Sequence, residues 1–258
     1  MERYLLFTLA APLASFGAVA VGERRPTWDR PSKSQTLGLI AGCLGIPRVE
    51  EARHLALAVG LGFAVRVDAR GQLASDYHTA QSPKEASMRR RAKTHGPVRT
   101  RSDELACDDL KTILSQREFV VGSQHTIALW RIGDTAPMLD EIAAALRQPV
   151  YTPFAGRKAN PLSLPMAPRI VDALSIEAAF AAFDAGEAEG VAAFKREISP
   201  RADSYRPIFA DLSAIPMDER AGRVGRHEQR RDLPESRAKW RFGLRSEVLI
   251  KETPEAAR

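Results

Sequence analysis

The sequence predicts an α+β fold built on an antiparallel sheet that carries helices on one face. Short apolar runs alternate with stretches of helical spacing in the order strand, helix, strands, basic insertion, strand, helix, strand. The 258 residues are 44% apolar and contain no internal repeat, as expected of a packed globular chain. We therefore expect one domain, residues 1–258, of the ferredoxin-like (RRM-like) kind.

The first half of this domain begins with a strand and two helices. Residues 4–9 are an apolar run that suits a buried strand, and residues 12–17 interrupt the pattern. Ser34 could then cap a helix that ends near Gly45, and a second short helix is expected at residues 50–59.

A pair of strands should follow these helices. Phe63, Val65 and Val67 alternate with other residues at the period of two that indicates a strand with one buried face. Asp68 to Gly71 predicts a hairpin turn, after which a second strand should run toward Tyr77.

Residues 80–115 differ in character from the rest of the chain. They contain few large apolar residues before Leu105, so they cannot bury much surface and should protrude. They include the cations Lys84, Arg89, Arg90, Arg91, Lys93, Arg99 and Arg101.

The second half returns to strand and helix patterns. A strand is expected at residues 119–130, helices at 139–146 and 175–183, and a loop at 150–160. Residues 220–258 form a basic C-terminal segment, in which the apolar residues Val248 to Ile250 could add an edge strand.

The charge balance indicates a polyanionic partner. The formal net charge is +6 and the isoelectric point is about 9.6, which favours nucleic acid or an anionic membrane surface without choosing between them. The longest apolar stretch, residues 4–21, is interrupted by polar residues and lacks a signal-peptide pattern. Cys43 and Cys107 are too few for a metal cage. We expect a cytoplasmic protein that does not enter the membrane.

Three groups of residues are candidate anion contacts, and each also has an ordinary structural explanation. The basic insertion could be a solvated loop, and Arg157 with Lys158 could belong to a surface turn after Gly156. Residues 30–34 combine two cations, two hydroxyls and a helix N-terminus, which is either an anion site or a simple helix cap.

Catalytic signals are weak. No H-x-E, H-E-x-x-H or clustered His and Cys motif is present, so neither a metal nor another cofactor is predicted. His78 is the best candidate for a general base, although a lone histidine is more often structural.

Four segments, in this order, resemble the Cas-five family of CRISPR proteins, in its type I-E branch. The first is residues 9–17 and the second is residues 30–46. The third combines residues 65–68, 76–79 and 117–119, and the fourth combines residues 145–150 and 156–158. The sequence departs from the family pattern at three positions of the opening motif, where it has Ala11, Ala14 and Phe16, and at Phe119, where the family has tyrosine.

The resemblance implies an RNA-binding scaffold rather than an enzyme. Its members have a ferredoxin-like core with a thumb, here residues 80–115, and hold the 5′ handle of the crRNA. They cap the backbone filament of the Cascade complex beside its large subunit, and meet target DNA only through the complex. The expected RNA contacts are Arg30, Ser32, Lys33, Ser34, His78, Arg89, Arg90, Arg91, Lys93, Arg99, Arg101, Arg157 and Lys158.

Two other functions stay open at this point. Some relatives in other CRISPR subtypes are metal-independent endoribonucleases, and Tyr77, His78, Lys93 and His95 could supply acid, base and phosphate contacts. Phe119 lacks the hydroxyl of its family counterpart, which argues against cleavage. A basic adaptor that contacts protein or membrane is the remaining alternative.

Overall fold

The computed structural model describes residues 1–18, 20, 22–198 and 205–251. Its main sheet has the strand order β10-β11-β9-β5-β7-β1-β8, and every neighbouring pair in this path is antiparallel. The predicted α+β class with a large antiparallel sheet is therefore confirmed. The strands are β1 (Glu2–Ala14), β5 (Leu61–Ala69), β7 (Leu110–Arg131), β8 (Arg169–Ala173), β9 (Ile208–Asp211), β10 (Val224–Ser236) and β11 (Arg241–Ile250).

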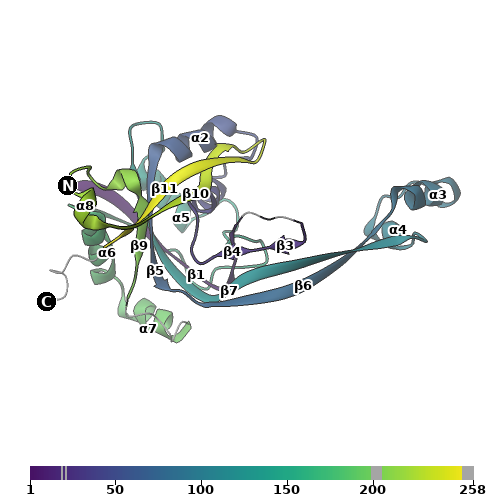
Figure 1. Cartoon of the computed structure of the whole chain (residues 1–258), viewed down its shortest axis with the longest axis horizontal. Helices are drawn as coiled ribbons and strands as arrows, with labels where there is room; N and C mark the ends of the chain where they lie inside the picture. Colours follow the sequence, from purple (N-terminus) through teal and green to yellow (C-terminus); the bar gives the residue numbers. More distant parts are fainter. Residues whose placement is uncertain (19, 21, 199–204, 252–258) are drawn as a thin grey trace.

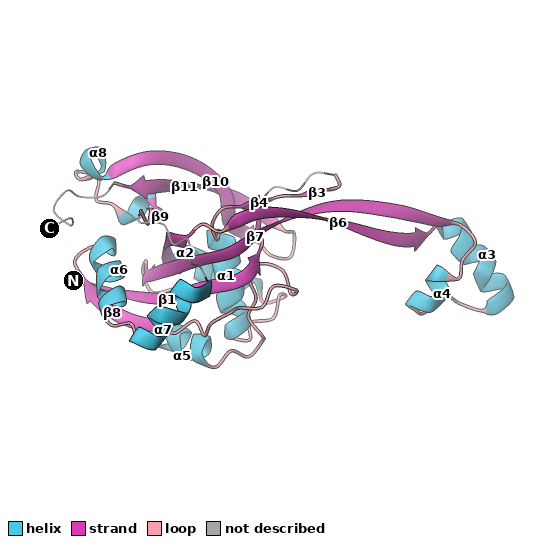
Figure 2. Cartoon of the chain, turned by 90° about the horizontal axis from the view of Figure 1, so that it is seen from below, coloured by secondary structure: helices cyan, strands magenta, loops and turns pink. Residues whose placement is uncertain are grey.

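Helices cover both faces of this sheet (Figures 1 and 2). One face packs against α1 (Lys33–Cys43), α2 (Glu51–Gly60) and α5 (Leu139–Arg147). The other packs against α6 (Ile176–Ala185) and the short 3₁₀ helix η1 (Leu212–Ala214). The expectation of helices on one face is thus wrong, although the helices predicted at 139–146 and 175–183 are confirmed.

Strand β5 explains why the second covered face is hard to detect. Phe63 and Val65 face the cluster formed with α1, as the period of two predicts. Ala64 and Arg66 are also buried, on the α6 face. Arg66 is tolerated there because its guanidinium donates to the carboxylate of Asp184 on α6, at 2.7 and 2.9 Å. An alanine and a paired arginine look like exposed positions in the sequence.

The turn predicted at residues 68–71 does not reverse the chain. Strand β6 (Gln72–Pro83) pairs with β7, as β5 does, and Ala69 opposite Gln124 is followed by Gln72 opposite Val121. Both strands therefore lie along the same side of β7. The chain bends at Gly71, which has φ +71°. The hairpin prediction was wrong because β7 has 22 residues and is long enough to pair with both strands.

Strand β6 and the first half of β7 leave the sheet as a two-stranded arm (Figure 1). Two helices lie at its tip, α3 (Glu85–His95) and α4 (Arg101–Leu105). The 12 residues of β6 span roughly 40 Å at 3.3 Å per residue. The arm contains the whole of the basic segment 80–115, and few of its side chains are buried.

Shorter elements complete the described chain. At the base of the arm, β2 (Phe16–Gly17) pairs with β4 (Thr27–Trp28), and β3 (Arg24–Arg25) pairs in parallel with β7. Helices α7 (Glu189–Ile198) and α8 (Arg220–Arg223) flank β9 in the sequence. No helix in the described ranges is long and apolar enough to cross a bilayer.

The basic C-terminal segment is largely part of the sheet. Strand β11 lies between β10 and β9, so the predicted edge position of residues 248–250 is wrong. The last seven residues of the predicted segment, 252–258, lie outside the described part of the chain.

Candidate nucleic-acid interface

The cations expected to meet phosphate at the start of α1 are buried in ion pairs. Lys33 is 4% exposed, and its Nζ lies 3.0 Å from a carboxylate oxygen of Asp211. Arg30 is equally buried and donates from Nε to Glu247 at 3.1 Å. The expected contact of Arg30 and Lys33 with RNA is therefore corrected, because these charges are shielded from solvent and neutralised by carboxylates far along the chain.

The N-terminus of α1 is also occupied by groups of this chain. The Oγ of Ser32 accepts a hydrogen bond from the Gln35 N–H at 3.2 Å, so the cap is Ser32 and not Ser34. The carboxylate of Asp232 accepts from the Lys33 N–H at 2.9 Å. The anion site predicted at this helix exists, but Asp232 fills it. The side chain of Ser34 is half-buried and lies 3.1 Å from the Ser32 hydroxyl.

The same ion-pair network joins α1 to the β10–β11 hairpin. Arg245 donates to Asp232, Asp211 and Glu247 at 2.7 to 2.8 Å. Burial alone would raise the pKa of Glu247, but its arginine neighbours outweigh burial and lower that pKa to about 2. This network, made of Arg30, Lys33, Arg230, Arg245, Asp211, Asp232 and Glu247, therefore fixes the C-terminal hairpin to the core.

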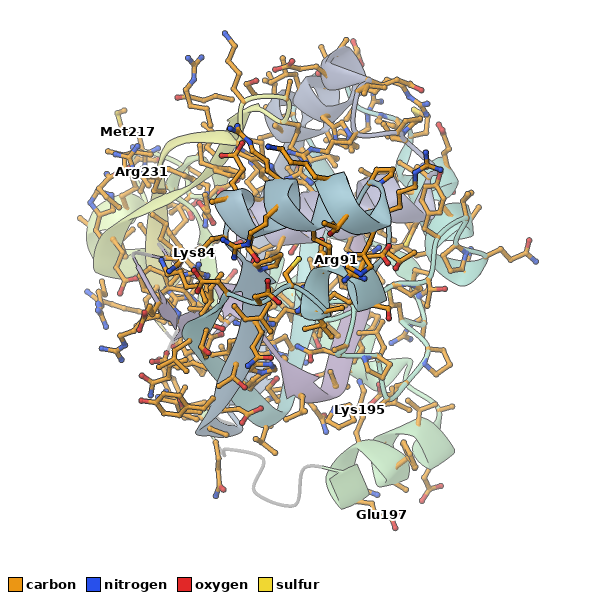
Figure 3. All side chains as sticks on the ribbon, turned by 90° about the vertical axis from the view of Figure 1, so that its right-hand side faces the viewer. Lys84, Arg91, Lys195, Glu197, Met217 and Arg231 are labelled. Atoms are coloured by element: carbon orange, nitrogen blue, oxygen red, sulfur yellow. The ribbon has the colours of Figure 1, made fainter. Side chains whose placement is uncertain are left out.

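At the tip of the arm, most of the predicted cations have a carboxylate neighbour. Five of the seven lie within 4.0 Å of one, in the pairs Lys84–Asp109, Arg89–Glu85, Arg90–Asp108, Arg91–Asp103 and Arg101–Glu104. Figure 3 looks along the arm from its tip, with Lys84 and Arg91 among the nearest side chains. Such exposed pairs contribute little stability, so a phosphate can replace the carboxylate. Lys93 and Arg99 have no ion pair among the described residues.

The residues considered for RNA cleavage do not form one site. Tyr77 and His78 are neighbours on β6, so they point to opposite faces of the arm. Tyr77 lies six residues, or roughly 20 Å of strand, before the end of β6. Lys93 and His95 belong to α3, which begins after that end, so they lie far from Tyr77. The Nε2 atom of His78 lies 3.2 Å from a carboxylate oxygen of Asp76. No three His, Cys, Asp or Glu side chains in the described ranges are grouped as a metal site requires.

A different group of cations gathers where the arm leaves the sheet. This basal cluster consists of Arg25 on β3, Arg117 on β7, and Arg157 with Lys158 in the loop after α5. The Arg157 guanidinium lies 4.6 Å from the centre of the Phe119 ring, and its Nη2 donates to the carbonyl of Arg25 at 3.4 Å.

The electrostatics of the basal cluster are unbalanced. None of its four cations has a carboxylate within 4.0 Å among the residues that the structure describes. Burial lowers the pKa of Arg157, and the positive charges of Arg117 and Arg25 lower it further. The nearest acids are Glu118, which pairs with Arg24, and Asp76, which lies opposite Arg117 in the β6–β7 ladder. Cations that repel one another gain from a polyanion, because each phosphate removes repulsion as well as adding attraction.

Backbone geometry builds this cluster from three distant segments. Gly156 has φ +85°, and a Cβ at this position would lie 1.8 Å from the carbonyl oxygen of Ser15. Only glycine lets the 150–160 loop approach Ser15, between β1 and β2, so closely, and this contact places the following Arg157 beside Phe119. The pairing of β3 with β7 places Arg25 opposite Arg117.

The sequence therefore identified half of the basal cluster. Arg157 and Lys158 were among the predicted RNA contacts, whereas Arg25 and Arg117 were not. The available signals were the Arg24-Arg25 doublet in a loop and an arginine within a strand that follows the basic insertion.

Comparison with known proteins identifies the family. A family model described as "CRISPR-associated protein (Cas_Cas5)" matches residues 4–247. The chain belongs to the Cas5 family of CRISPR-associated proteins. A relative of this Cas5-family protein, "CRISPR system Cascade subunit CasD" of Escherichia coli (strain K12), is 31% identical over 166 residues, which are 64% of this chain and 70% of the relative.

Solved structures share the fold of this Cas5-family protein. A chain of a "CRISPR RNA-guided surveillance complex" matches with a TM-score of 0.61 and 22% identity, over 98% of this chain and 92% of the other. A "Crystal structure of Cas protein" matches with a TM-score of 0.52 and 22% identity, over 96% and 95%.

Proposed function

We propose that this protein is the crRNA-binding structural subunit of a type I-E Cascade complex. It grips the 5′ handle of the guide RNA, caps the backbone filament beside the large subunit, and meets target DNA only through the complex. The basal cluster carries this proposal, because it holds four cations without an acidic partner among the described residues. The Escherichia coli relative, a Cascade subunit by name, supports the assembly.

The topology supports the ferredoxin-like part of the proposal. The order β1, α1, β5, β7, α5, β8 along the chain, with β5-β7-β1-β8 across the sheet, is that of two interlocked strand–helix–strand units. In this arrangement β9, β10 and β11 extend the core at the β5 edge. The arm corresponds to the family's thumb.

The basal cluster and the arm would contact different parts of the RNA. The cluster neutralises consecutive phosphates, which supplies most of the affinity and fixes the register of the strand. The arm, with its exposed Tyr77 and paired tip cations, separates neighbouring bases of the RNA. No covalent step is needed for either action.

The experiment compares full-length protein variants on two RNAs, one that begins with the 5′ handle of the repeat and one that lacks it. Wild type should prefer the handle RNA. Arg117→Gln with Arg157→Gln should weaken binding and lower the slope of log affinity against log salt by about 1.4, or about 0.7 for each single-strand phosphate that is no longer neutralised.

The matched control removes the same number of charges from the arm tip, as Arg89→Gln with Arg90→Gln. Because these arginines already have carboxylate neighbours, the control should lower the RNA affinity and its salt dependence less than the basal double variant does. Wild-type affinity and slope in the basal double variant would contradict the proposal. Incubation with repeat RNA in EDTA tests the enzymatic alternative, and a single specific cleavage product would overturn the assignment as a scaffold.

A further inference from the structure

Three residues at the root of the arm lie in one row across three neighbouring strands. The ladder register places Gly71, in the β5–β6 connection, opposite Gly122 of β7. On the other side of β7, the register with β1 places Pro12 opposite the same glycine. This root row, made of Pro12, Gly122 and Gly71, crosses the sheet where the arm bends away from it (Figure 1).

The root row interrupts the regular geometry of all three strands. Gly71 has φ +71° and Gly122 has φ +68°, whereas an antiparallel strand needs a φ of about −140°. Pro12 has no N–H, so β1 donates no ladder hydrogen bond to β7 at this point. Because the three irregular residues share one row, the three strands change direction together.

Two further features specify the bend at this row. The register of β5 shifts between Val67 and Ala69, and such a bulge bends and twists a strand. A Cβ on Gly71 would overlap the carbonyl oxygen of Val121 and lie 3.0 Å from the backbone nitrogen of Ser123. The two strands therefore approach each other so closely at the bend that only glycine fits.

Hydrogen bonds on the arm side of the row brace the arm against the core. The Glu118 carboxylate accepts from the Thr27 N–H at 3.2 Å and pairs with Arg24 at 3.1 Å. The Ser15 hydroxyl donates to the Glu118 carbonyl at 3.4 Å, and the Ser15 carbonyl accepts from the Gln35 side chain of α1 at 2.8 Å. These contacts link the root of the arm to α1, so the bend is held at one angle.

The angle of the bend decides where the arm lies relative to the basal cluster. Tyr77 is six residues of strand, or roughly 20 Å, beyond Gly71. A change of about 20° at the root row would move Tyr77 by about 7 Å, which is about twice the 3.4 Å between successive bases along one strand of a duplex. The cluster residues Arg117 and Arg157 would move much less, because they lie close to the row.

We infer that the root row is a positioning element, which sets the angle between the arm and the basal cluster and thereby the nucleotide that Tyr77 meets. This inference rests on the proposed function, since it requires the arm and the cluster to bind one RNA strand. Pro12, Gly71 and Gly122 act through the backbone of the arm and not by contact with RNA.

The first test measures the angle in the full-length protein without RNA. Spin labels on Ala52→Cys of α2 and Thr79→Cys of β6, both exposed positions, report one distance by double electron–electron resonance. The background carries Cys43→Ala and Cys107→Ala, so that only these two sites are labelled. The chain with an intact root row should give a single narrow distance distribution.

Substitutions at Gly122 should change this distance according to the φ that they tolerate. Gly122→Val disfavours φ +68° and should shift the mean distance by several ångströms, with Gly122→Ala as a milder variant of the same kind. Gly122→Asn tolerates the left-handed conformation and should restore the original distance. The matched control is Gly133→Val, which changes a glycine with φ +79° outside the arm and should leave the distance unchanged.

The second test locates the arm on the RNA. Benzoylphenylalanine in place of Tyr77 is photo-crosslinked to end-labelled handle RNA. The crosslink should fall on one nucleotide, move along the RNA in Gly122→Val, and return in Gly122→Asn. The salt dependence of RNA affinity should stay the same in all three, because the basal cluster keeps its charges.

The two tests separate failure of the inference from failure of the proposed function. A broad distance distribution with the intact row, or equal distances in that chain and in both Gly122→Val and Gly122→Ala, would overturn the positioning role and leave the proposed function intact. A crosslink that stays on the same nucleotide although the distance shifts would also overturn it. Shifted distances without any crosslink would support the angle-setting role of the row and count against the proposed function.

Discussion

The substitution Glu247→Gln tests whether charge balance in the buried ion-pair network stabilises the fold. Glu247 is 1% exposed and lies within hydrogen-bonding distance of Arg30, Arg230 and Arg245. Glutamine keeps the shape of a protonated glutamate and removes the charge. The variant therefore leaves three buried arginines with one carboxylate fewer.

The expected loss of stability follows from the pKa. Burial opposes ionisation of Glu247, yet the arginines lower its pKa from 4.5 to about 2. At about 1.4 kcal/mol per pKa unit, the charged form is worth about 3 kcal/mol of unfolding free energy at neutral pH. Removal of one partner from a buried pair costs about 3–5 kcal/mol in other proteins, which agrees.

Urea unfolding of wild type and variant at pH 7 measures this difference. Because the folded pKa is lowered, the contribution is fully present above pH 4.5 and is lost as the pH falls toward 2. The difference in unfolding free energy between wild type and variant should therefore become smaller as the pH falls from 4.5 to 2. Glu228→Gln is the matched control, since Glu228 also pairs with Arg30 but is partly exposed, and it should cost less than about 1 kcal/mol.

A Glu247→Gln variant within about 1 kcal/mol of wild type, or no worse than Glu228→Gln, would refute the reasoning. A double variant, Glu247→Gln with Arg230→Met, should regain part of the stability because it removes the excess positive charge. If the double variant is less stable than Glu247→Gln, packing rather than charge balance dominates at this position.

Three further outcomes are expected. Burial lowers the pKa of His125 to about 4, so protonation favours the unfolded chain, and wild type should lose about 2 kcal/mol between pH 7.5 and 5, a loss that His125→Gln should largely remove in urea unfolding. Gly156→Ala forces a Cβ against the Ser15 carbonyl at positive φ, so it should cost more than about 1 kcal/mol and weaken RNA binding measured by anisotropy. Ser32→Ala should lower the thermal midpoint because it removes a cap worth about 1 kcal/mol, whereas Ser34→Ala should not.

Local patterns predicted many elements because local forces set them. The amphipathic helix at 139–147 has one apolar side, and Ser175 caps the helix that follows it. These features involve residues within one or two turns of each other. The strand at 61–69 was likewise visible from its period of two, although only one of its two buried faces was recognised.

Contacts across long sequence distances explain the errors. Lys33 looks like a free cation at a helix start, and its carboxylate partner Asp211 is 178 positions away. Asp232, which fills the helix N-terminus, is 199 positions from Lys33. No periodicity links such residues, because their meeting depends on the order of strands in the sheet.

The sequence predicted the kind of residue in the candidate site better than the position of that site in the fold. Positive charge and the loop of Arg157 were recognised, but the basic segment at the arm tip carries its own acids, whereas the unbalanced cations lie at the arm's base. Arg230 was seen only as part of a basic C-terminal segment. Its burial beside Glu247 becomes evident only when β10 and β11 are paired.

The unbroken course of β7 has a mechanical consequence. The same 22 residues begin beside the tip helices and end between β1 and β5 in the middle of the sheet. A force applied to the outer helices is therefore carried by covalent backbone into the centre of the domain, through Gly122, which has φ +68°. Movement of the arm is therefore coupled through the backbone to the ladders that hold β1 and β5.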